Sequence, residues 1–155
     1  MKRILGALAL AMLPGVALAQ TDPVEQDRLY VSDPAACQLL ETKGVSAFED
    51  LDFTTLSFEQ GIQSLEFHCN FFDVKTKPGN AFTLVSAVCE TPGENYPDMF
   101  SIGRYNDDTI QVTSMSDSMF SLLSDGEGAG EAEENPLPLG VTLYHRCENL
   151  SELPR

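Results

Sequence analysis

Leu65-Glu-Phe-His-Cys-Asn-Phe71 is the stretch of this chain whose pattern decides the fold class. Apolar and polar residues alternate along it, and this period of two is typical of a β-strand with one face in the core and the other in water. The pattern predicts a strand over residues 65–71 with His68 on its polar face. Four side chains are expected on the core face: Leu65, Phe67, Cys69 and Phe71.

Further strands follow along the chain. Lys77-Pro-Gly-Asn80 is a strong turn signal, and residues 82–89 after it are apolar on both faces, as expected for a central strand. Residues 141–147 form the last predicted strand. One face of that strand carries Val141, Leu143, His145 and Cys147. These patterns together predict a mainly β fold, either a small antiparallel barrel or a curved sheet.

The hairpin in the middle of the chain can be assigned a register. Phe100 and Ile102 share a face on one strand, and Ile110 and Val112 share a face on the next. Apolar pairs meet across an antiparallel ladder only if the numbers of opposed residues have an even sum. Placing Ile102 opposite Val112 meets this condition and leaves a three-residue loop, residues 106–108. We therefore expect a bulged hairpin rather than a two-residue turn.

One short N-terminal helix is predicted before the strands. Asp33 can cap free backbone amides and Pro34 suits the first helical position, while residues 35–43 are mostly good helix formers. Gly44 can supply the left-handed residue that ends the helix. A second apolar cluster fits one face of a helix or a frayed strand about equally well: Met119, Phe120, Leu122 and Leu123.

The chain contains four cysteines, Cys37, Cys69, Cys89 and Cys147, and no Cys-x-x-Cys motif. An even number without that motif is typical of structural disulfides in an oxidising compartment. Cys69 and Cys89 flank one turn, and their numbers have an even sum, so they can share a face of one hairpin. Among the three possible connectivities we favour Cys69–Cys89 with Cys37–Cys147, which would tie the helix to the last strand.

The N-terminus has the features of a secretory signal peptide over residues 1–19. Lys2 and Arg3 precede an apolar stretch, and Ala17-Leu-Ala19 is a small-x-small cleavage site. Cleavage after Ala19 would place the protein in the periplasm or outside the cell, without membrane insertion. We expect a flexible leader over 20–31 and a single β-rich domain over 32–155.

The formal net charge is −15, with 24 acidic residues against 9 basic ones. Nucleic acid binding needs clustered Lys and Arg, so the charge argues against such a partner and in favour of a cationic one. Residues 125–135 are expected to form a mobile acidic loop. A calcium site of the EF-hand type does not fit there, because Ala129 and Pro136 stand at two ligand positions. No metal site is predicted.

The sequence contains no recognisable catalytic motif. No serine lies in Gly-x-Ser-x-Gly or Ser-x-x-Lys, no glycine-rich loop opens a helix after a strand, and the spacing does not bring His68 and His145 together. We therefore predict that the protein is not an enzyme and has no cofactor. The structural interpretation of each histidine, exposed for His68 and core-facing for His145, is favoured over a ligand role.

The predicted function is non-catalytic binding of a basic protein or peptide. Exposed aromatic residues at Tyr96, Tyr105 and Tyr144 are the expected anchors, with Arg104 beside them. Ser101-Ile-Gly-Arg-Tyr105 is loosely similar to the Ser-Gly-x-x-Tyr loop of bacterial lysozyme inhibitors, with the glycine displaced by one position. This five-residue similarity implies only that basic partners should be tested. The alternative is a structural or cation-buffering envelope protein without a specific protein partner.

Overall fold

The computed structural model describes residues 24–123 and 137–154. Its eight strands form a closed antiparallel barrel in which every strand pairs with its neighbours in chain order, and the last pairs with the first. This confirms the expected mainly β class and selects the barrel over the curved sheet. The strands are β1 (Tyr30–Val31), β2 (Thr55–Ser57), β3 (Gly61–Gln63), β4 (His68–Thr76), β5 (Phe82–Thr91), β6 (Glu94–Arg104), β7 (Thr109–Ser114) and β8 (Val141–Arg146).

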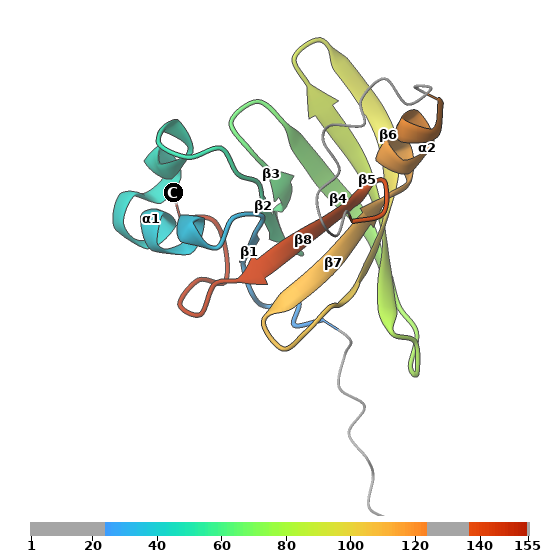
Figure 1. The fold of residues 1–155 in the computed structure, drawn as a ribbon, viewed down its shortest axis with the longest axis horizontal. Helices are drawn as coiled ribbons and strands as arrows, with labels where there is room; N and C mark the ends of the chain where they lie inside the picture. The colour runs from blue at the N-terminus through green and yellow to red at the C-terminus, as the bar shows by residue number, and fades with distance from the viewer. Residues whose placement is uncertain (1–23, 124–136, 155) are drawn as a thin grey trace, which may run out of the picture.

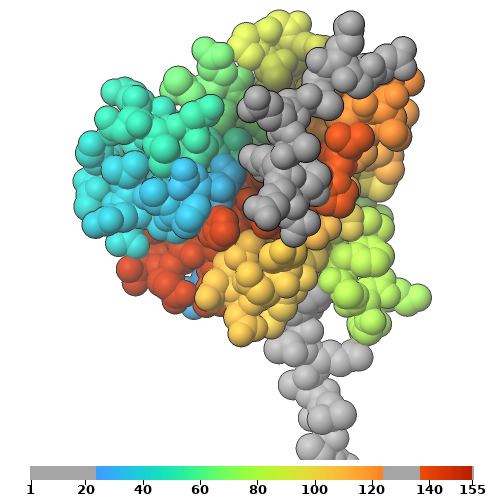
Figure 2. All heavy atoms as spheres, viewed as in Figure 1, coloured from blue at the N-terminus to red at the C-terminus, as the bar shows by residue number. Residues whose placement is uncertain are grey.

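Helices lie on opposite sides of this barrel (Figure 1). Helix α1 (Ala35–Lys43) continues directly into a 3-10 helix, η1 (Gly44–Glu49), and both lie beside the short strands β1–β3. Helix α2 (Met115–Leu123) follows β7 and lies near β6. The space-filling view shows the same separation (Figure 2). The sequence left a helix or a strand open for α2, and the helix is correct.

Two apolar clusters form the core. The first fills the barrel and includes Leu56, Val85 and Ile102, none of which is exposed to solvent. The second lies under α1 and η1 and includes Val31, Leu40 and the Cys147 side chain. Burial of a leucine or isoleucine side chain stabilises a fold by about 1.5–3 kcal/mol, so these clusters supply most of the driving force.

Helix α1 begins and ends as the sequence predicts. The Asp33 carboxylate accepts a hydrogen bond from the Ala35 amide at 2.8 Å, and Pro34 has helical backbone angles. Gly44 ends the helix with a φ of 59°, in the left-handed region that glycine adopts without steric cost.

The central hairpin also follows the prediction, because Ile102 lies opposite Val112. The amides of Tyr105 and Asn106 both donate to the Thr109 carbonyl, at 3.0 and 3.1 Å, and close the loop.

Both disulfides have the favoured connectivity. Cys69 and Cys89 are directly opposed on β4 and β5, with Cα atoms 3.9 Å apart. Cys37 on α1 is bonded to Cys147, which follows β8, and this bond closes a separation of 110 residues. The first bond therefore lies inside the barrel, whereas the second fastens α1 to the barrel.

The predicted start of the strand at Leu65 is wrong. Strand β4 begins at His68, and Leu65 is 68% exposed. The Ser64 amide donates to the Phe67 carbonyl at 2.7 Å, so residues 64–67 form a turn between β3 and β4. Alternation is correct from Phe67 onward, since Phe67 packs against the barrel core and Cys69 is buried, while His68 is exposed.

The predicted core face of the last strand is also wrong. Tyr144 points into the barrel opposite Ile110, so Leu143 and His145 lie on the outer face, where both are half-buried. The Nδ1 atom of His145 lies 3.3 Å from the Thr109 hydroxyl. Cys147 is buried as expected, but it follows the strand and belongs to the second cluster.

The leader predicted over 20–31 is not loosely held in the part that the structure describes. Val24 and Leu29 are buried, and Tyr30 and Val31 form β1. Leu29 is held by two backbone hydrogen bonds. Its amide donates to the Leu150 carbonyl, and its carbonyl accepts from the Cys147 amide. Residues 20–23 of that leader, the predicted signal peptide at 1–19 and the predicted acidic loop at 125–135 lie outside the described residues.

Arg146 joins three segments at one end of the barrel. Its guanidinium donates to Glu25 at 2.8 Å, to Asp108 at 2.8 Å and to Glu148 at 3.0 Å, and its side chain is only 19% exposed. The residue therefore holds the N-terminal segment, the β6–β7 loop and the C-terminal tail together.

Replacing Arg146 by methionine should lower the free energy of unfolding by about 1–2 kcal/mol. The three carboxylates remain partly in water, so each lost ion pair contributes little alone, and the loss comes from the network. Lys43→Met is the matched control, because Lys43 makes one exposed pair with Asp50. Urea unfolding followed by circular dichroism measures both; equal effects would contradict a linking role for Arg146.

Candidate functional site

The outer face of β4–β6 carries several large apolar side chains beside polar ones such as Asp73 and Lys75. Side chains alternate between the barrel interior and its exterior, and the exterior set here includes Phe72, Leu84, Val88 and Met99. They are exposed by 69%, 41%, 40% and 42% respectively. Contiguous exposed apolar surface of this kind often marks an interaction site.

A register shift in β4 contributes to this surface. Phe71 lies opposite Ala87 and Asp73 opposite Ser86, so Phe72 is the extra residue of a β-bulge. Phe71 packs against the barrel core, whereas Phe72 is turned outward.

Helix α2 lies next to this face and forms a groove with it. None of its residues is buried, and Met115 and Met119 are 51% and 57% exposed. The groove has a volume of about 400 Å³. We call it the methionine groove and define it by its lining residues: Phe72, Ser86, Ala87, Pro97, Asp98, Met99, Met115, Ser116 and Met119.

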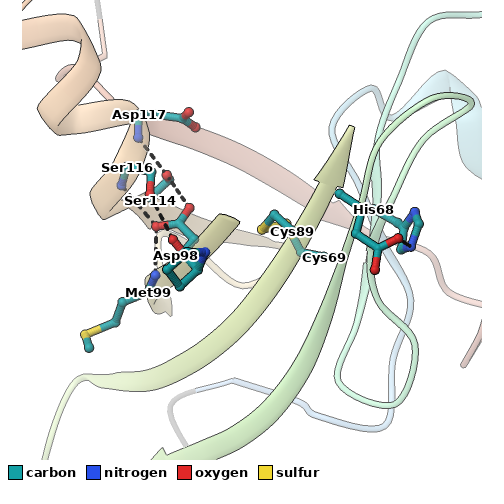
Figure 3. Close-up of a disulfide and its surroundings, with 10 residues drawn as sticks. His68, Cys69, Cys89, Asp98, Met99, Ser114, Ser116 and Asp117 are labelled. Atoms are coloured by element: carbon teal, nitrogen blue, oxygen red, sulfur yellow. Dashed lines mark hydrogen bonds and ion pairs between the residues drawn. A yellow bond between two sulfur atoms is a disulfide. The ribbon is translucent and has the colours of Figure 1, made fainter. Parts of the chain in front are cut away.

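Asp98 on β6 holds the first turn of α2 in place (Figure 3). One carboxylate oxygen accepts from the Ser114 hydroxyl at 2.7 Å, and the other accepts from the amides of Ser116 at 3.0 Å and Met99 at 2.7 Å. The Ser114 hydroxyl in turn accepts from the Asp117 amide at 3.0 Å. These bonds satisfy amides that a helix leaves free at its N-terminus, and they connect both walls of the groove.

The electrostatic potential at this end of the groove is negative, because Asp98 lines it and Asp117 lies in the first turn of α2. The pKa of Tyr96 is raised, first by burial and then by the nearby carboxylates of Asp117 and Asp98. No basic residue is among those that line the groove. A positively charged group would therefore be attracted to its rim.

The structure does not bring the four predicted anchor residues together. Tyr144 is wrong as an exposed anchor, because it is 4% exposed inside the barrel and its hydroxyl accepts from Thr54 at 2.8 Å. Burial raises the pKa of Tyr144 to about 12. Tyr96 is half-buried and packs against the barrel core.

Only Arg104 and Tyr105 are exposed neighbours, at the β6–β7 hairpin, where Tyr105 is 56% exposed. Neither residue lines the methionine groove. Sequence reasoning did not identify the groove, although Met115 and Met119 carried a signal for it, being spaced by one helical turn.

The titratable residues of the described region do not form a metal centre. His68 pairs with Glu90 across β4 and β5, with 3.1 Å between Nε2 and the carboxylate, while His145 lies on β8. Among residues 24–123 and 137–154 no three His, Cys, Asp or Glu side chains are grouped as metal ligands would be.

Helices α1 and α2 have nine residues each, and no helix in the described part of the chain is long and apolar enough to cross a membrane. Comparison with models of protein families, with curated proteins and with solved structures found no match.

Proposed function

We propose that this chain is an exported, non-catalytic binding protein for a basic protein or peptide, and that the methionine groove is its contact surface. The observation that carries this proposal is the groove itself, an exposed apolar hollow of about 400 Å³ on a chain with a net charge of −15. Apolar area holds a complex together, while opposite charge accelerates encounter and restricts the choice of partner.

The shape and chemistry of the groove favour a basic amphipathic helix as the bound segment. A groove between a helix and a sheet can accept the apolar face of a second helix. Met99, Met115 and Met119 are unbranched and polarisable, and such side chains adapt to different apolar surfaces. Cationic residues flanking the apolar face would lie near Asp98 and Asp117.

Export is supported by the cysteines. All four are paired in two disulfides, and disulfides persist mainly in oxidising compartments.

Protein purified from the envelope or medium of its host should begin at Gln20 or within a residue or two of it. Cleavage is expected there because Ala17-Leu-Ala19 matches a signal peptidase site. Intact-mass analysis measures the N-terminus directly. A mass that retains Met1 would contradict export by this route.

The double variant Met99→Gln/Met119→Gln should weaken binding of a basic partner by at least about tenfold with little change in melting temperature. Glutamine matches methionine in length but disfavours burial in an apolar contact. Suitable probes are a basic lysozyme, a basic protease and a synthetic amphipathic helix of leucine and lysine, followed by calorimetric titration at about 150 mM salt.

Leu122→Gln/Leu123→Gln is the matched control. Both leucines are exposed on α2, by 73% and 76%, and neither lines the groove. Equal weakening by the two double variants would remove the groove from the proposal. If no probe binds at this salt concentration and envelope extract yields no partner, the structural or cation-buffering role becomes the better explanation.

A further inference from the structure

A second surface on the opposite side of the molecule from α2 combines apolar hollows with carboxylates. Leu65, at the tip of the β3–β4 turn, stands between two hollows of about 310 and 360 Å³. Phe48, Glu49 and Leu65 line both hollows. We call this surface the Leu65 ridge and define it by those three residues with Val45, Asp50, Leu51, Asp52 and Phe53.

The apolar part of the ridge is exposed although its support is rigid. Leu65 is 68% exposed and Val45 is 48% exposed. Beneath them the rings of Phe48 and Phe53 stack at a centroid distance of 4.5 Å, and Phe53 belongs to the second core cluster. The hollows are therefore formed by residues that packing holds in position, and an incoming side chain need not order them.

The charge of the ridge has one sign. Its hollows are lined by Glu49, Asp50 and Asp52 and by no basic residue. Asp50 is paired with Lys43 at 2.7 Å. Within the described residues, Glu49 and Asp52 form no ion pair within 4.0 Å, so their charges are available to a partner.

We propose that the Leu65 ridge is a second binding site, independent of the methionine groove, for an extended polypeptide segment that carries apolar side chains and lysine or arginine on the same face. Successive residues of an extended chain point to opposite sides, so every second residue faces the ridge. Apolar residues in that set can fill the hollows while cationic residues in the same set reach Glu49 and Asp52. A second copy of this chain is a poorer occupant, because two chains of net charge −15 repel each other.

The test uses a blocked peptide in which every second residue is leucine or arginine in turn, with serine between them, and a second peptide with glutamine in place of arginine. Binding is followed by NMR with methyl labels on leucine, valine and methionine. The arginine peptide should shift the methyl signals of Leu65 and Val45, and the glutamine peptide should bind on the order of tenfold more weakly.

The variant Glu49→Gln/Asp52→Asn should weaken the arginine peptide on the order of tenfold and leave the glutamine peptide unchanged. Glu94→Gln/Asp107→Asn removes the same charge far from the ridge and should change binding less than about twofold. Equal loss of affinity in the two variants would overturn the proposal, because charge would then act only through the net charge of the molecule. Equal affinity for the two peptides would also overturn it, because charge would then play no part in binding.

The same labels separate this site from the groove. Shifts confined to the methyls of Met99, Met115 and Met119 would place the peptide in the methionine groove and overturn the ridge proposal without touching the proposed function. Conversely, Met99→Gln/Met119→Gln should leave the shifts of Leu65 and Val45 intact. If Met99→Gln/Met119→Gln does not weaken binding of a basic partner, the groove proposal fails and the ridge proposal is unaffected. The two proposals can therefore be rejected separately.

Discussion

The free energy of unfolding should fall by roughly 5 kcal/mol as pH rises from about 10 to above 12. The cause is two tyrosines, Tyr30 and Tyr144, that are 2% and 4% exposed. Burial raises the pKa of each to about 12 from a usual value of 10.0. Below pH 10 both hydroxyls keep their protons in either state, so this stability is fully present. This stability is lost as pH rises through 10 toward 12, because the tyrosines of the unfolded chain ionise at a lower pH than those of the folded chain.

Urea unfolding at a series of alkaline pH values measures this loss, and tyrosinate absorbance reports the ionisation directly. Tyr144→Phe should remove about half of the pH dependence, because each tyrosine contributes a shift of similar size. It should also cost about 1 kcal/mol at neutral pH, since Thr54 loses its acceptor. Tyr105→Phe is the control, because Tyr105 is 56% exposed. An unchanged pH profile in Tyr144→Phe would contradict the assignment.

Removal of the Cys37–Cys147 disulfide should lower stability by about 5 kcal/mol, which is a large part of the total for a domain of this size. The bond closes 110 residues, and a longer closed loop restricts the unfolded chain more. It also fastens α1, whose buried face includes Leu40, to the residues after β8. The double variant Cys37→Ala/Cys147→Ala, followed by thermal and urea unfolding, measures the effect.

Cys69→Ala/Cys89→Ala is the comparison. Its 20-residue separation predicts a smaller loss of about 3 kcal/mol in the same chain-entropy model. In this variant β4 and β5 remain hydrogen-bonded on both sides of the lost disulfide, so the barrel should persist. A larger loss from the 69–89 pair than from the 37–147 pair would show that packing around the sulfur atoms outweighs chain entropy.

The parts of the fold that local periodicity controls were predictable from the sequence. The Ile102–Val112 register and the Cys69–Cys89 pairing both follow from parity in antiparallel strands. The cap at Asp33 and the stop at Gly44 depend on residues within one helical turn. In each case the interacting residues are either close in sequence or joined by one turn.

Features set by distant segments were missed. The last strand carries apolar side chains on both faces, and only its pairing with Ile110 decides that Tyr144 points inward. Val24 and Leu29 stand among charged residues, and they are buried because the barrel and the chain after Cys147 cover them. The position of α2 on the barrel depends on Asp98, which is 18 residues away from Ser116. No pattern in the sequence around Asp98 indicates this hydrogen bond.

Closure of the barrel restricts how any partner can attach. Each described strand is hydrogen-bonded on both sides, since β1 pairs with β2 and with β8. The pairing is short on two of these sides, however, because β3 pairs with β4 only at His68 and Cys69, and β1 pairs with β8 only at His145 and Arg146. Among the described residues, the rest of β4 and of β8 has a ladder partner on one side only, so a foreign strand could be added at those two edges. Over the strands β5 and β7, recognition must therefore depend on side chains. Because β5 is paired along most of its length on both sides, the exposed Leu84 and Val88 are displayed without a backbone edge beside them that could act as a template for intermolecular sheets and amyloid-like growth.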